Sequence, residues 1–239
     1  MGRLRRRHGL AGTLLGFVRL WAVPIIIAGS GIFVVNLAFA STAPTPTELE
    51  VFLQDAQLIP HTETVEGYQQ VYYLFDDKKV FVTSDNMNHT NPISSGQYVV
   101  WLGSTDSTFA QVYLYDVMTN TTLQLSGLSN NTYPDMYANR VVWQQWVGGG
   151  WQVMYYDGLQ VLQVSEGTSS FRPRIYGDTI VYTTYNTTDS QTPWHVIDYD
   201  TQSQESSLIL KTADSTQAWP HFTQKGELST KYDLNYLSN

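Results

Sequence analysis

A sequence unit that returns about every forty residues constrains this chain more than any other feature. Each copy begins with a proline, passes through an apolar position and a turn, and ends in an apolar run closed by an aromatic residue. The copies begin at Pro92, Pro134 and Pro173, and a weaker copy begins at Pro220. Periods near forty residues are typical of repeat architectures in which each unit packs on its neighbours.

A second pattern lies between the proline units. Short alternating runs end in aspartate at 112–116, 153–157 and 196–200, and a matching run precedes them at 72–76. Each run is followed by another short apolar run: 80–82, 123–125, 161–164 and 208–210. Four short strands per period are typical of β-propeller blades. We expect the closing aspartates to accept backbone N–H bonds in the next turn.

The repeats predict an all-β protein, a β-propeller of about four four-stranded blades over residues 70–234. A single twisted sheet cannot bury both faces, so neighbouring sheets must stack. Three blades are complete, at 92–125, 134–164 and 173–210. Residues 70–83 supply a third and fourth strand, and residues 220–234 supply a first and second. We expect these two parts to form one composite blade that closes the ring, with an open arc as the alternative.

The pattern Pro-x-Ile-x-Gly-Asp-x-Ile-Val-Tyr, followed by Val-x-x-Tyr-Asp, resembles the TolB-like β-propeller repeat, in the version found in bacterial and archaeal cell-surface proteins. The resemblance covers roughly residues 70–228. It implies a propeller fold but no particular activity, because propellers serve as binding platforms, scaffolds and enzymes. TolB itself has six blades behind a separate α/β domain, and this chain has repeats for only about four.

The first forty residues have the order of a signal peptide. Arginines come first, an apolar run follows at 21–35, and the small residues Ala38 and Ala40 suit a cleavage site. An uncleaved anchor through residues 21–40 is the alternative, since twenty apolar residues can span a bilayer. Both interpretations place the remaining chain outside the cytoplasm, secreted, periplasmic or at the cell surface. Membrane contact is expected only through residues 21–40, if they remain uncleaved.

Residues 41–69 are expected to be a linker and lead-in to the repeats. The Pro/Thr-rich start of this segment is typical of a linker. A capping box formed by Thr47 and Glu50 predicts a short helix over 48–57.

Composition excludes several classes of function. The chain has no cysteine, so a disulfide, thiolate catalysis and cysteine-ligated zinc are impossible. Its formal net charge is −8, and five of the thirteen basic residues lie in the N-terminal segment. The remaining domain is therefore strongly acidic, which argues against nucleic acid as a partner.

No catalytic, metal or cofactor site is indicated by the sequence. Nucleotide-binding glycine patterns and the Gly-x-Ser-x-Gly elbow of hydrolases are absent. His61, His89, His195 and His221 have no nearby carboxylate motif, and we expect them on turns or strand surfaces. The carboxylates of 198–200 share one strand face but are too few for a calcium site.

Aromatic residues gather in the loops expected at one end of the propeller. Loops that join second to third strands share this end with the loops between blades. The tentative ligand-binding residues there are Trp146, Trp151, Trp194, Phe171, Trp219 and Tyr133. The alternative is that these rings pack between blades. Tyr133 and Trp219 adjoin prolines and are expected to be the most buried, whereas Trp146 and Trp151 are expected to be exposed.

The function that the sequence favours is an exported, non-catalytic propeller module that binds a protein or carbohydrate of the cell envelope, or serves there as a scaffold. Two alternatives stay open. A carbohydrate-active enzyme, a polysaccharide lyase or glycoside hydrolase, could assemble paired carboxylates from different blades. A partial propeller could instead be completed by oligomerisation.

Overall fold

The fold consists almost entirely of antiparallel strands. A computed structural model describes residues 33–35, 44–55, 57–105, 109–223 and 225–230. Among them are one α-helix, α1 (Pro46–Asp55), and one 3-10 helix, η1 (Ser215–Gln217). The predicted all-β class is confirmed.

The predicted signal peptide or anchor, residues 1–40, lies outside the described residues except for β1 (Phe33–Val35). This short strand pairs with the outer strand of the second sheet. No helix in the described part of the chain has the length and hydropathy that a membrane crossing requires.

The strands form five sheets in chain order. The first contains β2 (Pro60–Val65), β3 (Tyr68–Phe75) and β4 (Lys78–Phe81). The second contains β5 (Asn88–Ser95), β6 (Tyr98–Ser104), β7 (Gln111–Asp116) and β8 (Thr121–Gln124), with β1 beside β8. The third contains β9 (Asn131–Tyr137), β10 (Arg140–Val147), β11 (Gly150–Tyr156) and β12 (Val161–Gln163). The fourth contains β13 (Ser169–Tyr176), β14 (Thr179–Tyr185), β15 (Trp194–Asp200) and β16 (Glu205–Thr212), and the fifth contains β17 (His221–Phe222) and β18 (Leu228–Ser229).

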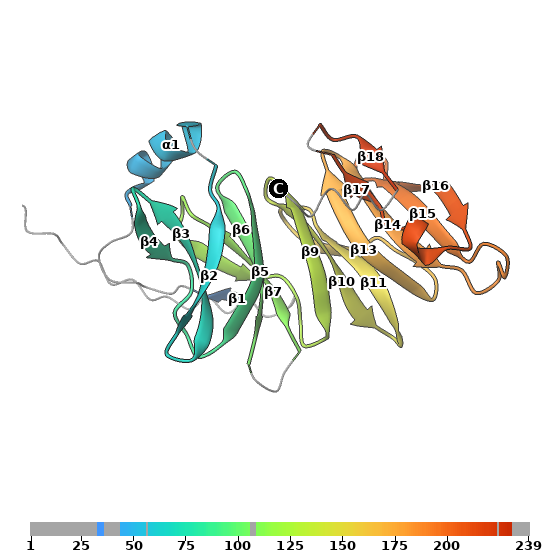
Figure 1. Cartoon of the computed structure of the whole chain (residues 1–239), viewed down its shortest axis with the longest axis horizontal. Coiled ribbons are helices and arrows are strands. Elements are labelled where there is room, and N and C mark those ends of the chain that lie inside the picture. Colours follow the sequence, from blue (N-terminus) through green and yellow to red (C-terminus); the bar gives the residue numbers. More distant parts are fainter. Residues whose placement is uncertain (1–32, 36–43, 56, 106–108, 224, 231–239) are drawn as a thin grey trace, which may run out of the picture.

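The sheets stand side by side as the blades of a propeller do. β5 contacts β9, β9 contacts β13, and β13 contacts β17, so the first strand of each blade meets the first strand of the next. Figure 1 shows the sheets as a row, with β2–β4 at one end and β16–β18 at the other. The three blades predicted as complete each contain the four expected strands.

The predicted composite blade is wrong. The first and last sheets are separate in the structure, because β18 pairs with β17 and β2 pairs with β3. β3 corresponds to the third strand of the other blades: the N–H of Val71 donates to Thr83 Oγ1, and β7 and β11 make the same bond to the hydroxyl of a serine. β2 therefore fills the second-strand position that we had assigned to the C-terminal segment. Only the first-strand position of this blade is empty among the described residues.

The aromatic residue that closes each proline unit is a core residue. Trp101 is buried between the first and second sheets, Trp143 between the second and third, and Tyr182 between the third and fourth. Each ring lies among valines and tyrosines of the preceding blade. The apolar run ending in an aromatic thus marks in the sequence where neighbouring blades stack and bury apolar side chains.

Two histidines are buried and paired with carboxylates, which corrects their predicted surface position. His89 Nδ1 accepts the indole N–H of Trp101 at 2.9 Å, and His89 Nε2 lies 2.9 Å from an Asp85 carboxylate oxygen. His195 Nε2 lies 3.3 Å from Asp189. Because both nitrogens of His89 are engaged within the protein, this ring stabilises the core rather than acting as a base.

Two local predictions, the cap of the short helix and the role of the turn aspartates, have different outcomes. The helix α1 is capped by Thr45 and Glu48, two residues before the predicted box, and Leu49 is the residue that the helix buries. The turn aspartates are confirmed in the three complete blades, where their carboxylates accept backbone N–H bonds of the next turn: Asp116, Asp157 and Asp200.

Candidate functional site

In the three complete blades, the residue before the repeat proline has an unusual backbone. Asn91, Tyr133 and Arg172 have positive φ angles of 52°, 52° and 51°. Such angles strain residues that carry a Cβ, and a following proline favours extended backbone instead. The strand register shifts at the same places, for example between Phe171 and Arg174. Each first strand therefore carries a bulge, a device that redirects a side chain out of the regular alternation.

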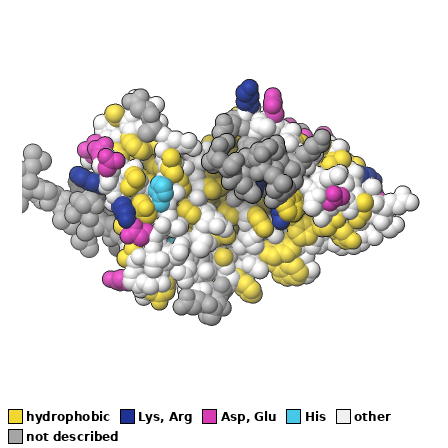
Figure 2. Space-filling model, viewed as in Figure 1, with side chains coloured by type: hydrophobic (Ala, Val, Ile, Leu, Met, Phe, Trp, Pro, Cys, Tyr) yellow, Lys and Arg dark blue, Asp and Glu magenta, His cyan; other side chains and the backbone are white. Residues whose placement is uncertain are grey.

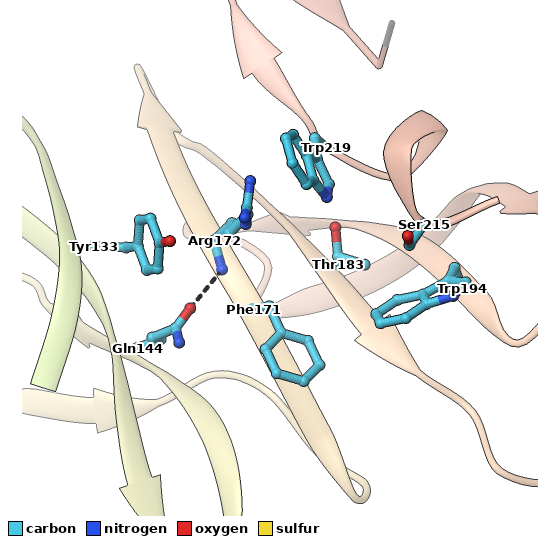
Figure 3. Close-up of a pocket in the computed structure, with 8 residues that line it drawn as sticks. All are labelled: Tyr133, Gln144, Phe171, Arg172, Thr183, Trp194, Ser215 and Trp219. Carbon is cyan, nitrogen blue, oxygen red and sulfur yellow. Dashed lines mark hydrogen bonds between the residues drawn. The ribbon is translucent and has the colours of Figure 1, made fainter. Parts of the chain in front are cut away.

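Two of these redirected side chains open into one pocket. The pocket has a volume of ≈ 310 Å³. Its walls come from the third and fourth blades and from the loop before β17, as Figure 3 shows. The lining residues are Tyr133, Gln144, Phe171, Arg172, Thr183, Trp194, Ser215 and Trp219.

Arg172 lies between two aromatic rings. Its guanidinium carbon is 3.6 Å from the centroid of the Trp219 ring and 5.3 Å from that of Tyr133, and Figure 3 shows the side chain between the two. Its backbone N–H donates to Oε1 of Gln144 at 2.9 Å, which ties the bulge to β10. The stacked position restricts the guanidinium plane and is favourable through cation–π attraction.

The opposite wall is an aromatic cluster. The rings of Phe171 and Trp194 are 6.0 Å apart, and Trp194 also meets Tyr185 at 4.9 Å. The hydroxyl of Thr183 donates to the carbonyl oxygen of Ala218, which fixes the segment that carries Trp219. The pocket is therefore built by strands and by anchored loop residues.

A second aromatic pair lies outside the pocket. Trp146 and Trp151 face each other across the β10–β11 hairpin, with ring centroids 5.5 Å apart and an interplanar angle of 83°. Gly148 and Gly149 form the turn with positive φ angles of 61° and 97°. Trp146 is 45% exposed, as predicted, and Trp151 is half-buried. Figure 2 shows hydrophobic side chains gathered over the neighbouring ends of β10 and β11.

The structure brings together four of the six predicted ligand-binding residues. Tyr133, Phe171, Trp194 and Trp219 line the pocket, and Trp146 and Trp151 do not. The expectation that Tyr133 is among the most buried is wrong: it is 44% exposed, because its left-handed backbone turns the ring away from the blade interface. Trp219 is half-buried.

Arg172 is a pocket residue that the sequence did not predict, together with Gln144, Thr183 and Ser215. It directly follows Phe171 and precedes the repeat proline, as Tyr133 does in the previous blade. Comparing the pre-proline position across repeats would have identified it.

Among the described residues, Arg172 is the single charged residue that lines the pocket, and neither a carboxylate nor a histidine lines it. A second hollow of ≈ 430 Å³ is lined by Asp135, Arg174 and His221, the residues that follow the repeat prolines. Burial raises the pKa of the Asp135 carboxyl, although Arg174 and the N–H groups of Ile175 and Met136 act in the opposite direction. Within the described residues, no cluster of three or more His, Asp or Glu side chains is arranged to hold a metal ion.

Comparisons with known proteins bear on the fold. No family model matches the chain, and a search of curated proteins finds no relative. Among solved structures, a TolB from Agrobacterium tumefaciens is similar, with a TM-score of 0.49, 16% identity, and 72% of this chain and 68% of that protein covered. TolB from Acinetobacter baumannii has a TM-score of 0.49 and 16% identity over 72% of this chain and 45% of its own length.

The β-propeller domain of the Trilobed protease from Pyrococcus furiosus is also similar, with a TM-score of 0.48 and 14% identity, covering 66% of this chain and 51% of that domain. This chain therefore spans about half the length of two of these three structures. The resemblance to TolB-like propellers predicted from the repeat is confirmed, and it concerns the fold alone.

Proposed function

We propose that this chain is an exported, non-catalytic binding module whose ligand, a protein or carbohydrate of the cell envelope, enters the aromatic pocket. The observation that carries the proposal is the pocket itself: Tyr133, Phe171, Trp194 and Trp219 converge from separate elements around one cavity. Such convergence of aromatic walls with a few polar groups is the usual form of a ligand site.

The pocket chemistry favours binding over catalysis. Glycoside hydrolysis needs two carboxyl groups across the scissile bond, and none of the described residues that line the pocket has one. Thr183 and Ser215 have hydroxyl groups, but the described part of the pocket wall has no histidine or carboxylate to activate them. The strained backbone at Tyr133 and Arg172 also fits a binding role, because strain is retained where a side chain must be aimed.

Export is part of the proposal and has its own test. Residues 1–40 have the signal-peptide order, and cleavage after Ala40 is expected. Mass spectrometry of the extracytoplasmic product should find Ser41 at its N-terminus. An intact chain retained in membranes would instead identify the segment as an anchor.

Ligand binding is tested with arrays of defined oligosaccharides and peptides probed with the full chain. Trp219→Ala and Trp194→Ala should reduce the signal of every bound probe at least tenfold, since each removes a pocket wall. The matched control is Trp146→Ala, which removes an exposed indole from the same end of the propeller. Loss in Trp146→Ala alone would move the site to the β10–β11 hairpin, and loss in no variant would refute the pocket.

A second candidate, assembly with another copy, is favoured by the first sheet. β2 occupies a second-strand position, and no first strand covers its inner edge among the described residues. Exposed strand edges are templates for pairing. Light scattering of the full chain should give a small multiple of the 27.0 kDa monomer if copies complete each other, and the monomer mass if they do not.

A further inference from the structure

We infer that the pocket recognises the free C-terminal carboxylate of a peptide that ends in a hydrophobic residue, with Arg172 as the anchor. The inference rests on the proposed binding function and names its ligand class. Its starting point is the charge of Arg172. Within the described residues, neither an ion pair nor a side-chain hydrogen bond involves this guanidinium group.

An unpaired cation in a partly enclosed cavity is costly unless something compensates it. Arg172 is half-buried, and desolvation of an ion without a partner is unfavourable. Three other basic residues of the described chain have carboxylate partners: Lys79 pairs with Glu63, Arg140 bonds to Asp178 at 2.8 Å, and Lys211 bonds to Asp189 at 3.2 Å. An anionic ligand would supply the missing partner.

The stacking geometry selects a planar anion. The guanidinium carbon lies over the Trp219 ring at 3.6 Å and over the Tyr133 ring at 5.3 Å, and a guanidinium group that stacks on an aromatic face keeps its N–H donors free for an anion in its own plane. Two parallel N–H donors match the two oxygens of a carboxylate. The rings also hold the group in place before the ligand arrives, which lowers the entropy cost of binding.

The remaining walls favour an apolar group beside that carboxylate. Phe171 and Trp194 present aromatic surface opposite Arg172, as Figure 3 shows. The hydroxyl of Thr183 already donates to Ala218, and Oε1 of Gln144 already accepts an N–H bond. A sugar ring needs many hydrogen bonds, whereas the terminal residue of a hydrophobic peptide needs the carboxylate bond and apolar contact.

The test compares N-acetyl-alanyl-phenylalanine with its C-terminal amide by titration calorimetry on the full chain. The two probes differ only in the carboxylate. The free acid should bind at least about tenfold more tightly than the amide, because hydrogen bonds to charged groups contribute more than neutral ones. Arg172→Gln should remove the preference, and Arg172→Lys should restore part of it, since the charge returns without the two-pronged geometry.

Each other outcome has a distinct meaning. Equal affinity of acid and amide, lost in Trp219→Ala, would overturn the carboxylate inference and leave the binding function standing. Trp219-dependent binding of a glucuronate oligosaccharide, without binding of the peptide, would overturn the peptide class. No Trp219-dependent binding of any peptide or oligosaccharide probe would overturn both the inference and the proposed function.

Discussion

The second and third blades agree at one position of the repeat, whereas another position differs in every copy. Behind the third strand, Gln111 Oε1 accepts the hydroxyl of Ser126 at 3.0 Å, and Gln152 Oε1 accepts that of Ser165 at 2.7 Å. Before the repeat prolines the side chains are unrelated: Asn91, Tyr133, Arg172 and Trp219. The first position is buried between blades, and the second opens into the pocket in the last three copies.

Physical chemistry explains why the two positions diverge. In the glutamine–serine network each serine also accepts the N–H of the third strand, Val112 or Val153, at 2.8 Å. Every member is buried, so replacing one residue would leave its hydrogen-bond partners unsatisfied and out of reach of water. A side chain that lines the pocket is not part of this buried hydrogen-bond network, so it can differ between copies of the repeat. We conclude that stability and ligand binding occupy separate positions of one repeat, and the predictions below test that separation.

The largest expected effect is in the core between the second and third sheets. Trp143 is 0% exposed, and Trp143→Ala should lower the free energy of unfolding by about 3–5 kcal/mol. Trp219→Ala, at the pocket wall, should cost less than half as much. Urea denaturation of both variants checks the contrast; equal losses would place Trp219 in the core.

A smaller loss is expected in the buried polar network. Gln152→Ala leaves the Ser165 hydroxyl and the Gly167 carbonyl without their partner, which should cost about 1–3 kcal/mol. The control is Gln160→Ala, whose side chain is exposed in a turn. A loss in Gln152→Ala no greater than that of the control, in chemical denaturation, would remove the network from the scaffold.

Asp135, which follows the repeat proline Pro134, should make the free energy of unfolding depend on pH. The raised pKa of Asp135 means that the folded protein holds this proton more tightly than the unfolded chain does. Its contribution is therefore most favourable below the ordinary carboxyl pKa and falls as pH rises through the folded pKa. Asp135→Asn keeps an oxygen for the Ile175 N–H and loses the titration.

The unfolding free energy of Asp135→Asn, relative to the natural chain, should accordingly rise with pH through the acid range. A difference that stays constant with pH, measured by urea denaturation at several pH values, would contradict the raised pKa.

The smallest expected effect on stability is at the pocket anchor. Glycine adopts the φ of 51° at position 172 without strain, so Arg172→Gly should stay within about 0.5 kcal/mol of the natural protein despite losing its stacking. Arg174→Gly, two residues later on the same strand, has no such strain to relieve and should lose about 1 kcal/mol. The reverse order in thermal melting would show that position 172 is not strained.

Features of the fold that many residues of the repeat encode could be predicted from the sequence, whereas features that depend on a single residue could not. The three complete blades and their closing aromatics follow from the period. β2 was missed because its sequence, Pro-His-Thr-Glu-Thr-Val, is mostly polar and lacks a strand pattern. The cap of α1 was misplaced because Thr45 and Thr47 both precede a glutamate by three residues; Pro46, which suits the first helical position, was the signal in favour of Thr45.

The candidate site was partly predictable for a similar reason. Loop aromatics were expected to gather at one end of the propeller, and four of them line the pocket. Arg172 was not predicted, because the residue before a proline is expected to be extended, and only the fold shows the bulge that redirects it.

The central claim, that scaffold and site are separable positions of one repeat, is tested by measuring affinity and stability in the same variants. N-acetyl-alanyl-phenylalanine is titrated into the natural chain, Arg172→Gly and Gln152→Ala, at a temperature where all three are folded. The account predicts that Arg172→Gly loses at least about tenfold in affinity with nearly unchanged stability, and that Gln152→Ala loses stability with nearly unchanged affinity. Affinity and stability falling together in both variants would contradict it.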